Sequence, residues 1–219
     1  MNIIKDFARN MLLVSPLKHL YYYRYQYNFV PSQICFLCNI ISDLKKVEGT
    51  VLEIGCAYGS TTVFLNKHMD AEGIEKPYVC IDTFEGFTDD DIAFEVQNRN
   101  KIQAMFINGF KFNSKNRFDS TMSFNGINRV KSYKADICKF DLSSLGPIAF
   151  CLLDVDLYKP TTHALPRLYQ QLAPGGMIVI DDYQADERYD GALEAYTEFC
   201  DNNNLKLDIV HNKLGIIRK

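Results

Sequence analysis

Apolar residues gather in short runs along the chain, and these runs predict seven β-strands. Several runs, such as VLEIG and IAFCLLD, are continuous rather than alternating, which is typical of strands that helices bury on both faces. Helical periodicity fills residues 60–69, 161–172 and 191–202, and a Pro-Gly-Gly triplet at 174–176 is expected to end the second of these helices. The predicted strands are 51–55, 78–82, 129–135, 148–154, 177–181, 205–210 and 214–218.

The order of these elements predicts an α/β sheet that is mostly parallel. Strands alternate with helices, so right-handed crossovers should connect them. Only residues 211–213 separate the last two strands, which is too short for a crossover and requires an antiparallel hairpin. This arrangement resembles that of class I methyltransferases, whereas a dehydrogenase sheet normally ends without a reversed strand. We therefore expect a Rossmann-like, seven-stranded sheet with a reversed last strand and flanking helices.

Two segments lie outside this predicted core. Residues 1–48 are predicted to be helical around an aromatic middle at 21–27, and charged residues interrupt the apolar ones of the first helix, unlike in a secretory signal. Residues 84–128 form a long excursion between the second and third strands. Excursions of this length are usually functional lids or partly disordered. We expect an N-terminal helical lid at 1–48 and a main domain at 49–219 that carries a second lid.

Composition and charge narrow the class of protein. Hydrophobic residues make up 47% and charged residues 23% of the chain, as in an ordinary soluble domain. The net charge of −3 disfavours a nucleic-acid partner, and no apolar run reaches the roughly 18 residues of a membrane span. Seven cysteines favour reduced thiols and a cytoplasmic protein over a disulfide framework. Cys35 and Cys38 form a CxxC without a second pair, so zinc is disfavoured.

A glycine turn after the first strand predicts a cofactor site. Glu53 precedes Gly55 and Gly59, and their spacing is GxxxG rather than GxGxxG, because Ala57 stands where the dinucleotide fingerprint requires glycine. A nicotinamide oxidoreductase is therefore disfavoured. The pattern of an acidic residue before GxxxG fits a ligand that has a methionine tail and no pyrophosphate, S-adenosylmethionine (SAM). A tight strand-to-helix turn without a ligand is the alternative.

Carboxylates at the next two strand ends extend this predicted site. Asp82 ends the second strand and can accept both ribose hydroxyls of an adenosine. Asp136, after the third strand, is expected to reach the adenine amino group while Ile137 packs beside the ring; a solvated loop residue is the alternative. The candidate cofactor-binding residues are Glu53, Gly55, Cys56, Ala57, Tyr58, Gly59, Ser60, Asp82, Thr83, Phe84, Asp136, Ile137 and Asp154.

Four aspartates end the fourth and fifth strands, Asp154 and Asp156 on one and Asp181 and Asp182 on the other. If these strands are neighbours, about 5 Å separates them, and the carboxylates converge. Like charges at a partly buried site are costly, and a hard divalent cation resolves the conflict. We expect Asp154, Asp181 and Asp182 to bind a metal, magnesium first, with turn and cap aspartates as the alternative. Adjacent residues of a regular strand point to opposite faces, so the chain should already turn at Asp182.

Together these segments resemble the macrocin O-methyltransferase family, which includes mycinamicin sugar and novobiocic acid methyltransferases. The resemblance covers roughly residues 49–219, and within the excursion little aligns beyond FDST at 118–121. It implies a metal-dependent enzyme that methylates hydroxyl groups, often on deoxysugars of natural products. The stretches that carry it are LEIGCAYGSTTVFL, IDTFEGF, LLDVDLYKPT, LAPGGMIVIDDY and GIIRK.

The resemblance also implies roles for single residues. Asp154, Asp181 and Asp182 match metal ligands, and Asp156 matches the general base; the positions that match SAM-binding residues are Glu53, Gly55, Asp82, Asp136 and Ile137. His163, shortly after the fourth strand, is the rival base, with a helix-surface residue as the simpler interpretation. The expected acceptor is a small, sugar-like molecule with a hydroxyl, ideally a vicinal diol that completes a metal chelate.

Two other functions stay open on the sequence. A catechol-type O-methyltransferase would use the same metal on a phenolic diol, and the tyrosines of 21–27 could stack on such a ring. A non-catalytic SAM-binding protein would not need four acids at the strand ends. The same tyrosines also suit packing or an interface, so a homo-oligomer is left open.

Overall fold

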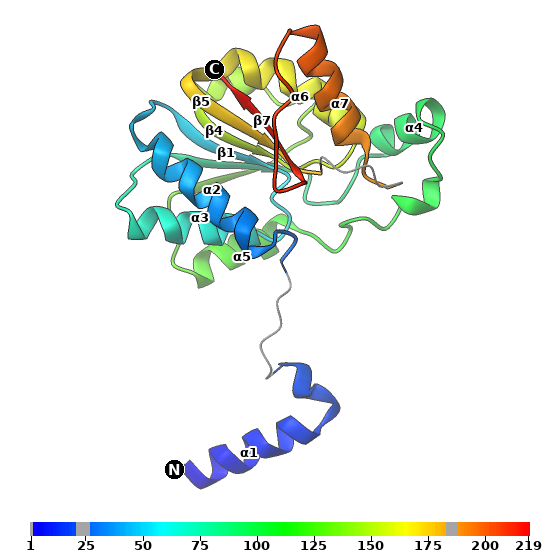
Figure 1. Cartoon of the computed structure of the whole chain (residues 1–219). Helices are drawn as coiled ribbons and strands as arrows, with labels where there is room; N and C mark the ends of the chain where they lie inside the picture. Colours follow the sequence, from blue (N-terminus) through cyan, green and yellow to red (C-terminus); the bar gives the residue numbers. More distant parts are fainter. Residues whose placement is uncertain (1, 21–26, 183–187) are drawn as a thin grey trace. The chain divides into compact units, whose positions relative to one another are not determined.

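The computed structural model describes residues 2–20, 27–182 and 188–219 (Figure 1). The chain divides into two compact units, Met1–Val30 and Pro31–Lys219. In the first unit, α1 spans Asn2–Val14 and the 3-10 helix η1 spans Pro16–Leu20. The tyrosines at 21–26 lie outside the described residues, so the lid proposed for them stays a prediction.

The second unit is built on a seven-stranded sheet in the order β3-β2-β1-β4-β5-β7-β6. The strands β1 to β5 pair in parallel, and β7 runs antiparallel to both β5 and β6, so the predicted closing hairpin is present. Every predicted strand has its counterpart. The strands are β1 Thr50–Ile54, β2 Tyr78–Asp82, β3 Val130–Lys134, β4 Ile148–Leu153, β5 Leu172–Ile180, β6 Ile209–Val210 and β7 Leu214–Arg218.

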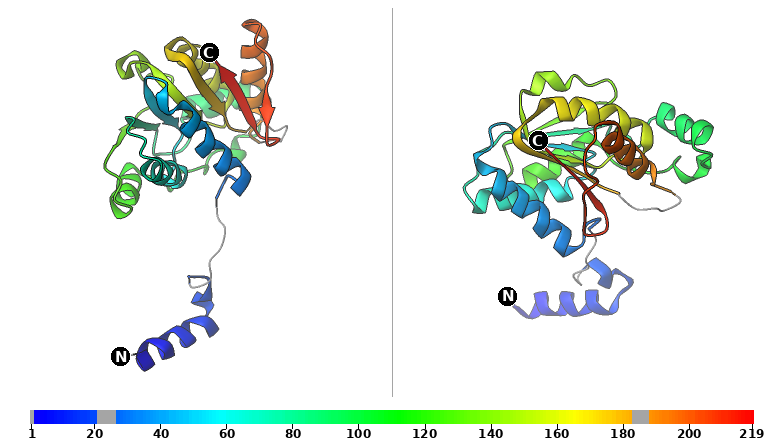
Figure 2. Two further views of the ribbon diagram at one scale, coloured as in Figure 1. Left: turned by 60° about the vertical axis from the view of Figure 1, so that its left-hand side comes forward. Right: turned by 45° about the horizontal axis from the view of Figure 1, so that its top comes forward.

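Helices cover both faces of this sheet, as the continuous apolar strands predict. Figures 1 and 2 show α2 and α3 over one face and α6 and α7 over the other. No helix in the described part of the chain is long and apolar enough to cross a bilayer. The helices are α2 Pro31–Asp43, α3 Ser60–Ala71, α4 Asp89–Asn98, α5 Lys115–Phe124, α6 Tyr158–Gln171 and α7 Gly191–Asn202; the short 3-10 helices are η2 Leu44–Lys46, η3 Gln103–Met105 and η4 Leu142–Leu145.

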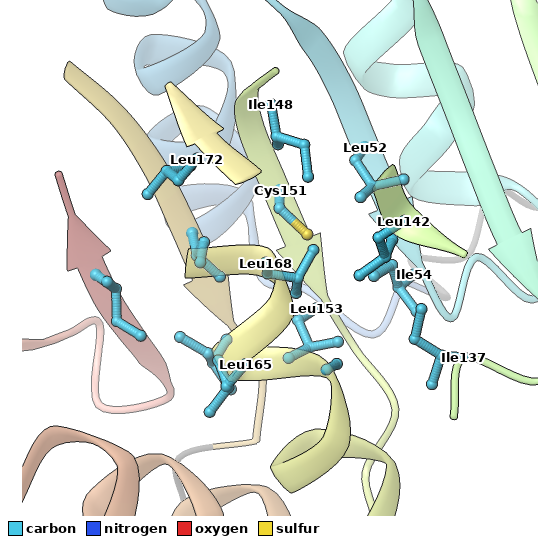
Figure 3. Close-up of a cluster of buried hydrophobic side chains, with 14 of the residues drawn as sticks. Leu52, Ile54, Ile137, Leu142, Ile148, Cys151, Leu153, Leu165, Leu168 and Leu172 are labelled. Carbon is cyan, nitrogen blue, oxygen red and sulfur yellow. The ribbon is translucent and has the colours of Figure 1, made fainter. Parts of the chain in front are cut away.

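The main core lies between the sheet and the pair α6 and α7 (Figure 3). Leu52 and Ile54 of β1 and Leu153 of β4 face the buried Leu165 and Leu168 of α6. Burial of such side chains contributes roughly 1.5–3 kcal/mol each. It fixes the register of β1 and β4, and therefore the points at which both strands end.

Several predicted boundaries shift, and the predicted strand at 205–210 is reduced to Ile209–Val210. Two of the shifts have identifiable reasons. The compact unit begins at Pro31 rather than at residue 49, because α2 buries Ile34, Leu37 and Ile41. The strand β5 begins at Leu172, before the Pro-Gly-Gly triplet that was expected to precede it, and its pairing with β4 shifts register there.

The excursion at 84–128 is folded rather than structureless. It contains α4, η3 and α5, and its side chains Ile92 and Phe106 form a small separate core with Leu157. Phe118 of α5 is fully buried and packs against Phe84 at a ring distance of 5.3 Å. The helix α5 lies against β3 and α4 lies against α6, so the excursion packs on the main unit through both of these helices.

Gly55 shows how tightly the strand ends are packed. Its φ is +84°, and a Cβ built on it would lie 1.6 Å from the backbone oxygen of Asp154. By contrast, Gly73 has a φ of +61° but meets no atom within 4 Å. Gly55 thus allows the end of β1 to approach the end of β4, a use of this glycine that the sequence pattern did not reveal.

We expect Gly55→Ala to lower the free energy of unfolding by about 3 kcal/mol or more, because both the backbone angle and the space exclude a side chain. Gly73→Ala, the matched control, should cost about 1–2 kcal/mol, since only the left-handed backbone opposes it. Urea denaturation of the two variants measures the difference. Equal losses would contradict the close approach of β1 and β4.

Candidate active site

Asp82 connects the end of β2 to the glycine turn that follows β1. Its Oδ2 accepts the Ala57 N–H at 2.8 Å, and its Oδ1 accepts the Phe84 N–H at 2.6 Å. Burial raises the pKa of Asp82, and the hydrogen bonds from these amides oppose that rise. Each carboxylate oxygen can still accept a second hydrogen bond. The residue therefore shapes the turn and keeps acceptor capacity for a ligand hydroxyl.

Glu53 is buried beneath the same turn, with 2% of its surface exposed. Its Oε2 accepts hydrogen bonds from Thr62 Oγ1 at 2.7 Å and from the Tyr78 hydroxyl at 2.8 Å. Burial raises its pKa to about 7, although both hydroxyl hydrogen bonds lower it. A cation placed against this carboxyl would favour its ionised form.

The remaining residues predicted around the cofactor occupy several environments. Ser60 begins α3, Cys56 and Phe84 are buried, and the Thr83 hydroxyl donates to the Gly86 carbonyl at 2.6 Å. The Arg117 guanidinium lies 3.8 Å from the ring centre of Tyr58, so α5 borders the glycine turn.

Two predicted residues beyond β3 are held by neighbours in the described structure. Asp136 Oδ1 accepts the Cys138 N–H at 2.8 Å, and its Oδ2 lies 3.2 Å from Lys139 Nζ. Ile137 is buried in the main core with Leu142. Core packing therefore accounts for Ile137 without a ligand, and the adenine contacts of both residues stay a prediction.

Three of the four predicted aspartates come together where β4 and β5 end. One carboxylate oxygen each from Asp154, Asp156 and Asp182 lies within 4.8 Å of the other two. Asp156 and Asp182 both have a φ of +62°, a left-handed backbone that aspartate tolerates better than most residues. The strand β5 has already ended at Ile180, so the chain does turn at this point as expected.

Asp181 lies beside this group, with its carboxylate directed to a lysine. Lys213, in the turn between β6 and β7, places Nζ 2.7 Å from Asp181 Oδ2 and 3.3 Å from Asp182 Oδ1. The three carboxylates whose oxygens lie together are therefore those of Asp154, Asp156 and Asp182, whereas the sequence predicted Asp154, Asp181 and Asp182. Lys213 was missed, because only the hairpin topology brings residue 213 to this edge.

The electrostatics of the acidic group show that Lys213 compensates its negative charge only in part. Burial, followed by the charges of Asp181, Asp156 and Asp182, raises the pKa of Asp154. Burial and the hydrogen bond with Asp182 raise the pKa of Asp156, and burial raises that of Asp181 to about 6 despite Lys213. The charge of Asp181 acts on Asp154 more strongly than those of the other two aspartates, so all four carboxylates form one cluster.

His163, the rival base, lies on the exposed surface of α6. Its Nδ1 is 3.0 Å from the carbonyl oxygen of Lys159, one turn earlier in the same helix. This is the arrangement of an ordinary helix-surface histidine. The structure gives His163 no contact with the described aspartates of the cluster, which favours Asp156 as the candidate base.

The family model for macrocin O-methyltransferase (TylF) matches residues 37–214. A tetracenomycin derivative 4'-O-methyltransferase from Streptomyces olivaceus, named for its dimethoxy-rhamnosyl substrate, is 27% identical over 150 residues, which are 64% of this chain and 55% of the relative. The chain therefore spans little more than half the length of that relative.

Two solved structures share the fold. The O-methyltransferase NovP aligns with a TM-score of 0.68 and 16% identity, over 86% of this chain and 78% of its own. The calicheamicin methyltransferase CalS11 aligns with a TM-score of 0.69 and 17% identity, over 97% of this chain and 90% of its own. At such identities the similarity establishes the Rossmann-like class I architecture, which the sequence predicted.

The buried carboxyl of Glu53 makes stability depend on pH. Its pKa of about 7 in the folded chain, against 4.5 ordinarily, means that the folded state binds more protons between these values. The free energy of unfolding should therefore fall as pH rises through this window. In Glu53→Gln this contribution is absent, so its stability relative to the unsubstituted protein should rise by about 2–3 kcal/mol between pH 5 and pH 8. Urea unfolding of both proteins across this pH range is the measurement. If their free energies of unfolding change in parallel with pH, the prediction for Glu53 is wrong.

Proposed function

The chain belongs to the macrocin O-methyltransferase family, and on that premise we propose that it transfers a methyl group from SAM to a hydroxyl of a sugar on a glycosylated small molecule. The observation that carries the proposal is the contact between the two halves of the site. Gly55 of the glycine turn lies directly against the Asp154 backbone, and the Asp154 N–H donates to the Ile54 carbonyl at 2.8 Å. A methyl donor held at the turn would face the acidic cluster.

The glycine turn and the end of β2 form the proposed SAM site. The free acceptor capacity of Asp82 suits the ribose hydroxyls, and the buried Glu53 suits the positive ammonium of the methionine tail. Asp136 stays our candidate for the adenine amino group. Since the donor already carries a sulfonium, the protein has to align it with the acceptor oxygen and to accept a proton.

The acidic cluster fits a divalent cation. Its donors are all carboxylate oxygens, which suits Mg²⁺ or Mn²⁺, and their mutual repulsion is compensated in the described structure by the Lys213 ammonium. We propose Asp154, Asp181 and Asp182 as ligands. Asp181 follows the end of β5 directly, and its carboxylate shares the Lys213 ammonium with that of Asp182, so a cation in the place of this ammonium would meet both. A cation bound there would lower the pKa of an acceptor hydroxyl that touches it.

Asp156 is the proposed general base. Its oxygen lies within 4.8 Å of those of Asp154 and Asp182, so it borders any hydroxyl held at the cluster. A cation at the cluster would keep this carboxylate ionised against the burial that raises its pKa. The oxygen–methyl bond would then form as the sulfur–methyl bond breaks, the hydroxyl proton would pass to Asp156, and S-adenosylhomocysteine would be released. Its left-handed backbone turns it out of the strand direction toward Asp182.

We expect SAM and S-adenosylhomocysteine to bind saturably in isothermal calorimetry. Asp82→Ala should weaken this binding by about 1–3 kcal/mol, because it removes buried hydrogen bonds to the ligand and leaves two turn amides without their acceptor. Asp201→Ala, on the exposed surface of α7, is the control and should change nothing. Unchanged affinity in Asp82→Ala would remove Asp82 from the site, and no binding in the unsubstituted protein would contradict the proposed function.

The four aspartates should separate into two classes. Asp154→Asn, Asp181→Asn and Asp182→Asn should weaken Mn²⁺ binding at least tenfold in electron paramagnetic resonance titrations, because each removes a negative ligand. Asp156→Asn should keep Mn²⁺ and lose turnover by roughly 10²–10⁴-fold. If Asp156→Asn loses Mn²⁺ while Asp181→Asn retains it, Asp156 is a metal ligand and Asp181 is not. Full activity after EDTA treatment would contradict the metal proposal.

A further inference from the structure

A buried glutamate in the excursion touches the segment that carries the acidic cluster. Glu95, in α4, has none of its surface exposed. Its Oε1 accepts the backbone N–H of Tyr158 at 2.8 Å, and its Oε2 lies 2.5 Å from Arg99 NH1. Burying an unpaired carboxylate costs free energy. Here both carboxylate oxygens of Glu95 have a hydrogen-bond donor, which offsets that cost.

The Tyr158 amide needs a hydrogen-bond acceptor from outside α6, because it is the first N–H of that helix. Such amides have no acceptor inside their own helix. The preceding residue, Leu157, supplies no side-chain cap. Glu95 therefore caps α6 from another helix, and its negative charge suits the helix N-terminus. The residue it holds lies two positions after Asp156.

Arg99 extends this contact to the start of α7. Its NH2 lies 2.9 Å from Asp190 Oδ1 and 2.7 Å from Glu194 Oε2, and Lys101 Nζ lies 2.8 Å from Asp190 Oδ2. Burial lowers the pKa of the Arg99 guanidinium, but the hydrogen bonds that it donates to the carboxylates of Glu194, Glu95 and Asp190 more than offset this effect. The guanidinium therefore stays charged, and it joins α4 to the first turn of α7.

Three segments meet closely at this point. A Cβ on Gly191, the first residue of α7, would lie 2.3 Å from the Tyr158 nitrogen and 3.1 Å from Glu95 Oε1. The Ala192 N–H donates to the Asp156 carbonyl at 3.2 Å. The helix α4 also lies against α6 (Figure 1). The turn that carries Asp154 and Asp156 is thus held from α4 and from α7 together.

We propose that Glu95 is a positioning residue for the acidic cluster. Through the Tyr158 amide it fixes the turn at 154–158, and through Arg99 it links that turn to α7. The part of the excursion at 89–101 is then a fixed wall of the site, where the sequence had suggested a moving lid. The consequence for metal binding rests on the proposed function; the structural coupling does not.

Two conservative variants separate this role from that of a simple ion pair. Glu95→Gln keeps the length and the acceptor oxygen but loses the charge, whereas Glu95→Asp keeps the charge but withdraws the oxygen from Tyr158. Amide hydrogen exchange at Tyr158, followed by NMR, is the readout. We expect exchange within about threefold of the unsubstituted protein in Glu95→Gln and at least tenfold faster in Glu95→Asp. The reverse order would overturn the proposal, and so would unchanged exchange in both variants.

A second readout addresses the cluster itself. With S-adenosylhomocysteine present, Glu95→Asp should weaken Mn²⁺ binding about tenfold and Glu95→Gln less than threefold, while the affinity for S-adenosylhomocysteine stays within twofold. Glu194→Ala removes only the exposed partner of Arg99 and is the control, with neither readout changed. If the unsubstituted protein binds no Mn²⁺, the metal proposal fails and the Tyr158 result still decides the role of Glu95. If the unsubstituted protein binds Mn²⁺ and Glu95→Asp binds it with equal affinity, the positioning role is overturned.

Discussion

The repulsion among four aspartates at the ends of β4 and β5 is the constraint on which the rest of the site depends. The fold gathers these carboxylates because neighbouring parallel strands end at one edge. Burial intensifies the repulsion, and it raises the pKa values of Asp154, Asp156 and Asp181. Lys213 supplies one compensating charge. Because the buried carboxylates repel one another, a positively charged ligand would stabilise the cluster, and we favour this interpretation over a purely structural role.

The cluster and the glycine turn are parts of one structure rather than separate sites. Gly55 admits the Asp154 backbone, and Asp82 holds the turn through two amide hydrogen bonds. On the other side, α4 and α7 hold the turn that carries Asp156. The acceptor would therefore meet a rigid donor site and a rigid acidic site, so that alignment of the reacting atoms is built into the fold.

The sequence predicted the sheet well, because buried parallel strands leave continuous apolar runs and the short 211–213 link permits only a hairpin. It also placed the four aspartates at one edge. It could not find Lys213, Glu95 or the Thr62 and Tyr78 partners of Glu53, since these contacts join segments far apart in the chain. Nor could it decide which aspartates share a face, because that depends on the left-handed backbone of Asp156 and Asp182.

We propose that the cluster binds a divalent cation beside a bound methyl donor. Crystals grown with Mn²⁺ and S-adenosylhomocysteine would test it through anomalous scattering at the manganese edge. We predict one strong peak in contact with the carboxylates of Asp154, Asp181 and Asp182, with the nucleoside product at the Gly55–Gly59 turn. A product bound there without an anomalous peak, or a peak distant from these carboxylates, would contradict the account.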